Sequence, residues 1–140
     1  MAAISGGPAC KRLFHVEDSG ELRRRIGREV ARLTGIEVVG FSDREDDAIR
    51  QIRRIKPDLV VLDLQLAYGS GIGVLRELRP GPGPPTLIVL TNHAGSGFRE
   101  LSLRAGAHHF FDKSTQLEEF IALLKGIVQH ADQNRLAVPL

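Results

Sequence analysis

The sequence has 140 residues, of which 42% are hydrophobic and 26% charged, with a formal charge of +2 and one cysteine, Cys10. This length predicts a single domain with a full hydrophobic core. No apolar stretch approaches the roughly 20 residues of a membrane span, one cysteine cannot form an internal disulfide, and the basic excess is too small to indicate nucleic-acid binding. We therefore expect a cytoplasmic protein that binds neither membranes nor nucleic acid directly.

The apolar pattern predicts five strands in alternation with five helices. The strands are the short apolar runs 12–16 (RLFHV), 36–41 (IEVVGF), 59–62 (LVVL), 86–90 (TLIVL) and 108–111 (HHFF). Segments of helical periodicity follow each of them, at 19–34, 44–55, 70–79, 96–105 and 115–131. Strict alternation of this kind is typical of a parallel sheet covered by helices on both faces.

These elements predict one domain over 11–131. The residues 1–10 are small and contain Gly and Pro, so we expect a loose N-terminus, and 132–140 form a C-terminal tail. The segment RPGPGPP, 79–85, predicts a stiff loop before the fourth strand. We expect a doubly wound (βα)5 fold of the flavodoxin-like type, an α/β fold with a five-stranded parallel sheet in the order 2-1-3-4-5.

Polar residues stand where the predicted strands end. In this strand order the first and third strands are neighbours, and ligands bind beyond the carboxyl ends of the strands at that point. The polar residues are Glu17 and Asp18 after the first strand, Asp63 after the third, Thr91 after the fourth and Lys113 after the fifth. Three carboxylates this close repel one another unless a cation lies among them, and hard oxygen ligands suit Mg²⁺. The sequence therefore predicts a Mg²⁺ site at this edge.

Four motifs at the strand ends, VEDS, VVLDLQL, VLTN and FFDKS, together resemble the receiver domain of two-component response regulators over about residues 11–130. The resemblance implies that Asp63 accepts a phosphoryl group from a histidine kinase or a phosphotransfer protein. It implies the remaining roles as follows: Glu17, Asp18, Asp63 and the backbone carbonyl of Gln65 bind Mg²⁺, Thr91 and Lys113 bind phosphoryl oxygens, and Thr91 with Phe110 forms a switch.

The resemblance also implies how such a protein works. It is a phosphorelay signalling module and not an enzyme, apart from catalysing its own phosphorylation and dephosphorylation. We expect it to stand alone, as a monomer or weak dimer, and to signal by contact with an output protein that the sequence does not identify.

Two positions depart from the pattern of that family. Ala67 stands where the family often has Pro, and the glycine-rich stretch YGSGIG follows it, so the loop over the site should be more mobile or differently shaped. Ser114 stands where the family usually has a cis Pro. Since a cis bond before a residue other than proline costs about 3 to 4 kcal/mol, we expect a trans Lys113–Ser114 bond.

Three other functions fit parts of the pattern. A Mg²⁺-dependent phosphatase of the haloacid dehalogenase type needs a second Asp two residues after the first, where this chain has Gln65. A flavin carrier would want a Ser/Thr-rich phosphate loop after the first strand, where two acids stand instead. A receiver that no longer takes phosphate and acts as a fixed binding module differs from the main hypothesis only in its chemistry.

Overall fold

The computed structural model describes residues 10–78 and 83–136, without the side chains of Ser96 and of 131–136. The expectations of a loose start over 1–10 and a stiff loop over 79–85 fall largely on residues 1–9 and 79–82, which lie outside the described residues. The expected tail over 132–140 falls partly on 137–140, which also lie outside them, whereas 132–136 belong to the last helix and not to a tail.

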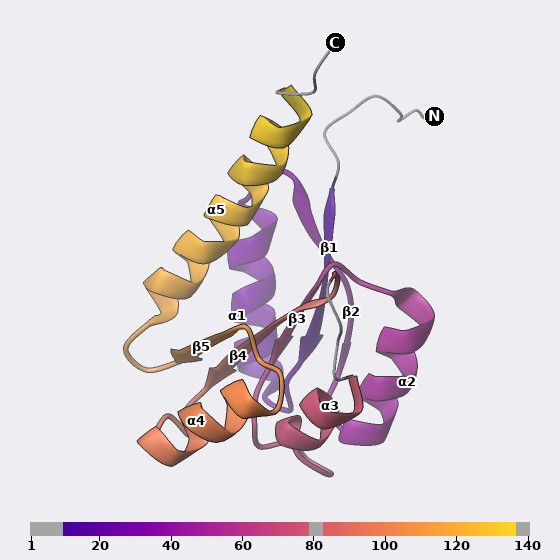
Figure 1. The fold of residues 1–140 in the computed structure, drawn as a ribbon, viewed down its shortest axis with the longest axis vertical. Helices are drawn as coiled ribbons and strands as arrows, with labels where there is room; N and C mark the ends of the chain where they lie inside the picture. Colours follow the sequence, from indigo (N-terminus) through magenta and orange to yellow (C-terminus); the bar gives the residue numbers. More distant parts are fainter. Residues whose placement is uncertain (1–9, 79–82, 137–140) are drawn as a thin grey trace.

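Five parallel strands form one sheet in the order β2-β1-β3-β4-β5, as the sequence predicts. The strands are β1 (Lys11–Val16), β2 (Ile36–Ser42), β3 (Leu59–Leu62), β4 (Thr86–Thr91) and β5 (His109–Asp112). All four residues of β3, the central strand, are buried, which suits a strand that is covered on both faces. The fold is therefore the expected flavodoxin-like α/β fold (Figure 1).

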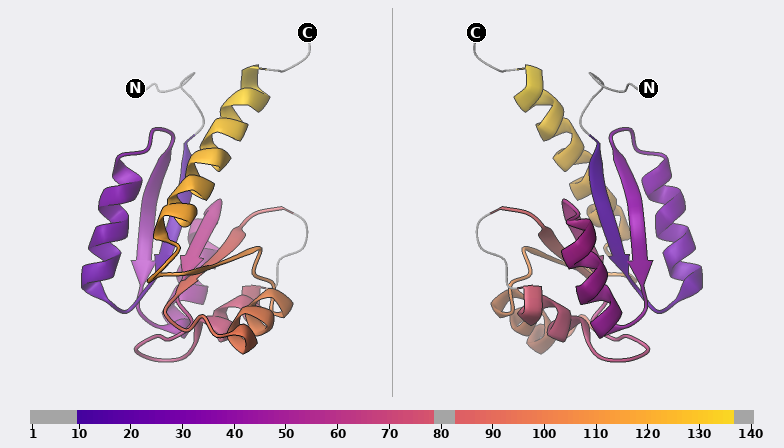
Figure 2. Two further views of the ribbon diagram at one scale, coloured as in Figure 1. Left: turned by 90° about the vertical axis from the view of Figure 1, so that its left-hand side faces the viewer. Right: turned by 90° about the vertical axis from the view of Figure 1, so that its right-hand side faces the viewer.

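Helices cover both faces of this sheet. They are α1 (Gly20–Ala31), α2 (Glu45–Ile55), α3 (Gly71–Leu78), α4 (Ser96–Arg104) and α5 (Leu117–Leu136). The two side views show α1 and α5 on one side of the sheet and α2 on the other (Figure 2). None of the described helices is long and apolar enough to cross a bilayer.

Each face of the sheet has its own apolar core. On one face, residues such as Phe14 and Leu62 pack with Ile52 of α2 and Leu75 of α3. On the other face, Leu13, Val61 and Leu90 pack with Ile26 of α1 and Phe120 of α5. Alternate residues of each strand enter opposite cores, so the sheet is held from both sides and the ends of its strands keep a fixed relative position.

The last helix begins and ends later than the sequence predicts. The range 115–131 was expected, whereas α5 runs from Leu117 to Leu136. Its start is delayed because the Asp112 carboxylate accepts hydrogen bonds from the backbone N–H and the hydroxyl of Ser114, at 2.9 and 2.6 Å, which form a turn.

Candidate functional site

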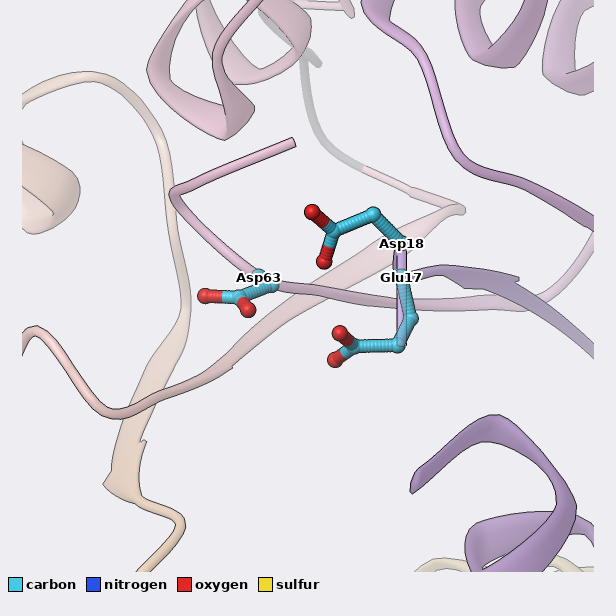
Figure 3. A group of neighbouring side chains, drawn as sticks. All are labelled: Glu17, Asp18 and Asp63. Carbon is cyan, nitrogen blue, oxygen red and sulfur yellow. The ribbon is translucent and has the colours of Figure 1, made fainter. Parts of the chain in front are cut away.

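Three carboxylates meet beyond the ends of β1 and β3, the two neighbouring central strands. Glu17, Asp18 and Asp63 each offer an oxygen, and these oxygens lie within 4.8 Å of one another (Figure 3). Glu17 is 1% exposed and Asp63 is 6% exposed, whereas Asp18 faces solvent. The predicted acidic cluster is therefore present, and two of its three carboxylates, Glu17 and Asp63, are buried.

The Asp63 carboxylate is held by donors from two strands. The backbone N–H of Asp63 donates to the Val16 carbonyl at 3.0 Å, which ties the end of β3 to β1. Its Oδ1 atom accepts hydrogen bonds from the backbone N–H of Leu64 at 2.7 Å and from the Thr91 hydroxyl at 2.5 Å. Thr91 is fully buried, so its hydroxyl has a fixed direction toward Asp63.

Lys113 lies between the two buried acids. Its Nζ atom is 2.8 Å from Asp63 Oδ2 and 2.9 Å from Glu17 Oε1. Its backbone N–H donates to the Thr91 carbonyl at 3.0 Å, which extends the pairing of β4 with β5 to this residue. Burial alone would lower the pKa of Lys113, but the contacts with Asp63 and Glu17 outweigh burial and raise it. The ammonium therefore stays charged at neutral pH.

Glu17 keeps one oxygen free of hydrogen bonds. Its Oε2 atom accepts from the backbone N–H of Ser19 at 3.1 Å. Its Oε1 atom is buried, and no donor in the described part of the chain is aligned to hydrogen-bond to it, although Lys113 approaches it as an ion pair. Burial raises the pKa of Glu17, and Lys113 opposes that rise. A buried carboxylate oxygen with unused acceptor capacity is a suitable ligand for a hard cation.

The acids lie at the floor of an open cleft of about 300 Å³, which is lined by Glu17, Asp18, Ser19, Asp63, Gln65, Asn92, His93 and Lys113. Near its mouth, His93 Nε2 and Gln65 Oε1 are in hydrogen-bond contact. The backbone N–H of His93 donates to the Thr91 hydroxyl at 3.1 Å. The cleft is small and lined by polar side chains, so it suits an ion or a small polar ligand better than an apolar ligand.

The Lys113–Ser114 bond is trans, as expected from the sequence; among the described residues the cis bond joins Pro84 and Pro85. The loop after β3 is held by backbone contacts. Gln65 pairs with Ser70 in an antiparallel bridge, and the Ala67 N–H donates to the Asp43 carbonyl at 3.1 Å. A Cβ built on Gly71 would collide with the Asp63 carbonyl oxygen, so only glycine permits this approach of α3 to the site.

Two further residues bear on the site. Phe110 is 6% exposed and packs in the core beside Val89. Arg99 of α4 lies over its ring, 5.8 Å from the centroid. His15, a polar residue within the first apolar run of the sequence, is 2% exposed; burial and the nearby charges of Lys113 and Arg23 lower its pKa to about 4.

A doubly wound domain with an acidic cleft at the ends of β1 and β3 has the architecture of a receiver domain. Residues 13–125 match the response regulator receiver domain, and the chain belongs to this family. The transcriptional regulatory protein YvfU of Bacillus subtilis is 26% identical over 118 residues, which are 84% of this chain and 59% of that protein. A methylesterase/glutaminase of Carboxydothermus hydrogenoformans is 31% identical over 116 residues, 81% of this chain and 34% of that one.

Solved structures agree with this assignment. A LuxR-family two-component response regulator from Aurantimonas has a TM-score of 0.78 and 30% identity, with 87% of each chain covered. The BeF3-activated receiver domain of RstA from Klebsiella pneumoniae has a TM-score of 0.74 and 30% identity, with 84% of this chain and 98% of that one covered. The chain thus spans a third to three fifths of the two curated relatives named above, but most of these receiver structures.

Proposed function

We propose that this chain is a phosphorelay receiver in which Asp63 accepts a phosphoryl group from a histidine kinase or a phosphotransfer protein. The observation that carries the proposal is the convergence of two donors on one acidic side chain: Thr91 bonds to one Asp63 oxygen and Lys113 to the other. The same two donors can hold oxygens of a phosphoryl group once it is attached. The RstA receiver, a relative, has been solved in a BeF3-activated form.

The transfer requires little beyond positioning and charge. An Asp63 oxygen attacks phosphorus, the bond from phosphorus to the donor's imidazole nitrogen breaks, and the electron pair stays on that nitrogen, which then takes a proton. Thr91 and Lys113 shift from the carboxylate to the equatorial oxygens, where negative charge must be stabilised. His93 and Gln65 have to separate, or let the donor pass, for phosphorus to reach Asp63.

The acidic cluster fits a resident Mg²⁺. Glu17, Asp18 and Asp63 supply hard oxygens within reach of one ion, and Glu17 Oε1 has unused acceptor capacity. The backbone carbonyl of Gln65 is the further ligand that we propose. When bound, Mg²⁺ supplies positive charge that offsets the repulsion between the phosphoryl group and the carboxylates.

The phosphorylated state would act on a partner through protein contacts. We propose that Thr91 and Phe110 form the switch, because they lie on the neighbouring strands β4 and β5 and Phe110 carries Arg99 of α4 over its ring. The Phe110 ring is already buried in this structure. Thr91 would have to leave Asp63 for its hydroxyl to bind the phosphoryl group.

The test is intact mass after incubation with acetyl phosphate and Mg²⁺. The wild-type protein should gain one phosphoryl group, Asp63→Asn should gain none, and excess EDTA should abolish labelling. Asp58→Asn is a matched control, because Asp58 lies at the opposite end of β3 and should leave labelling intact. Labelling of Asp63→Asn at the wild-type level would refute the assignment.

A further inference from the structure

Glu45, the first residue of α2, reaches across to the loop between β3 and α3. Its Oε1 atom accepts a hydrogen bond from the backbone N–H of Ser70 at 2.9 Å, and its own backbone N–H donates to the Tyr68 carbonyl at 2.9 Å. Glu45 therefore holds the loop at two successive points, one through its side chain and one through its backbone.

Ser70 joins this contact to the cleft. It caps α3, since its hydroxyl accepts from the backbone N–H of Ile72 at 3.0 Å, and it pairs through its backbone with Gln65. Gln65 lines the cleft above Asp63 and contacts His93 there. The Glu45 side chain thus fixes Ser70. Ser70 in turn caps the start of α3 and pairs with Gln65 across the loop.

Two glycines leave room for the Glu45 side chain. A Cβ built on Gly69, whose φ is +93°, would lie 2.7 Å from Glu45 Oε1, and a Cβ on Gly73 of α3 would lie 2.5 Å from the same oxygen. Any side chain at Gly73 would therefore push the carboxylate off Ser70. Gly73 stands inside a helix, where glycine is unfavourable relative to alanine, so its presence there has a packing reason.

We infer that Glu45 is a positioning residue for the phosphorylation site: it holds the segment from Gln65 to Ser70 in the register that places Gln65 at the rim of the Asp63 cleft. Its effect on phosphorylation rests on the function proposed above, whereas its effect on the loop does not.

A double-mutant cycle between Glu45 and Gly73 tests the contact without any phosphorylation. Gly73→Ala should lower Tm when Glu45 is present, because the new methyl displaces the carboxylate. In the Glu45→Ala background, Gly73→Ala should leave Tm unchanged or raise it. Alanine favours the helix more than glycine does, and there is no Glu45 carboxylate for the new methyl to displace. An equal drop in Tm in both backgrounds would overturn the inference, even if Asp63 is the phosphoacceptor.

The rate of labelling by acetyl phosphate tests the positioning role. Glu45→Ala should be labelled roughly fivefold more slowly, the scale expected for the loss of one hydrogen bond. Glu45→Gln keeps an acceptor for Ser70 and should restore the rate. Asp46→Ala is the matched control, because Asp46 is also an acid in the first turn of α2 and, within the described residues, its carboxylate accepts a hydrogen bond only from the backbone N–H of its neighbour Asp47.

The same variants give a spectroscopic readout that does not depend on labelling. In Glu45→Ala the amide resonances of Ser70 and Gln65 should shift, whereas in Asp46→Ala they should not. Rates and shifts in Glu45→Ala equal to those of Asp46→Ala would refute the positioning role. A failure of the proposed function would appear separately, as undiminished labelling of Asp63→Asn.

Discussion

At the scale of single residues, burial shifts the pKa of two groups near the cleft, His15 and Glu17. His15 and Glu17 are both almost fully buried on β1 and its end, and burial disfavours the charged form of each. The pKa of His15 is consequently lowered, and that of Glu17 is raised. Lys113 remains charged because it has two acids as partners.

The buried His15 should make the protein sensitive to acid. Its folded pKa of about 4 lies below the unfolded value of 6.5, so the unfolded chain binds more protons between these pH values. The free energy of unfolding should therefore fall as the pH drops from 6.5 to 4, by up to roughly 3 kcal/mol from this group. His15→Phe, measured by urea unfolding in Mg²⁺-free buffer, should flatten that dependence. His130→Gln, at an exposed position on α5, should not, and a slope unchanged in His15→Phe would contradict the prediction.

At the scale of elements, α4 is packed differently from the other helices. Its large apolar side chains stay partly outside the core: Phe98 is 46% exposed, Leu101 38% and Leu103 40%. The small residue Ser102 is buried instead, and its hydroxyl donates to the Phe98 carbonyl at 2.7 Å. By contrast, α1 buries Ile26 and Val30. Little apolar area therefore holds α4 to the sheet.

This packing predicts that α4 opens more readily than its neighbours. Backbone amides of Leu101–Arg104 should exchange with solvent at least roughly tenfold faster than those at Ile26 and Val30 of α1, because opening α4 exposes little buried surface. Hydrogen exchange followed by NMR at neutral pH gives the comparison. Equal protection in the two helices would show that contacts other than apolar burial stabilise α4.

Phe110 supports the same region from β5. Phe110→Ala should destabilise the protein by about 3 to 5 kcal/mol, because it leaves a cavity in the core beside Val89. Phe98→Ala removes the same number of atoms from a half-exposed position on α4 and should cost less than about 1 kcal/mol. Urea unfolding measures both. Similar losses in the two variants would mean that Phe110 is not a core residue in solution.

At the scale of the whole molecule, a cation in the acidic cluster should stabilise the fold. The ion would bind the folded chain, in which the three acids meet, and not the unfolded chain, in which Asp18 and Asp63 are 45 positions apart along the sequence. Free Mg²⁺ at a hundred times its Kd should raise the free energy of unfolding by about 2.7 kcal/mol. Thermal unfolding at constant ionic strength measures this, and Asp18→Asn, at an exposed position, should respond much less. An equal rise in Tm in both proteins would place the ion elsewhere.

The order of the elements could be predicted from the sequence because it rests on local patterns. Apolar runs such as LVVL at 59–62 predict buried strands, and the helical periods between them predict a sheet with two covered faces. The order 2-1-3-4-5 is one of the common doubly wound orders that right-handed crossovers permit. This order is enough to predict that the polar residues at the strand ends lie at one edge of the sheet, since each comes at or just after the end of a strand. These residues are Glu17, Asp18, Asp63, Thr91 and Lys113.

What the tertiary structure alone decided is how those side chains are held. The contact of Lys113 with Asp63 joins residues 50 apart, that of Thr91 with Asp63 residues 28 apart, and that of Glu45 with Ser70 residues 25 apart. In the sequence, Glu45 is an ordinary acidic residue in the first turn of a helix, and Gly73 is a glycine that weakens a helix. Their pairing depends on the packing of α2 against α3, and a local pattern carries no information about which side chains two distant segments bring within hydrogen-bond reach.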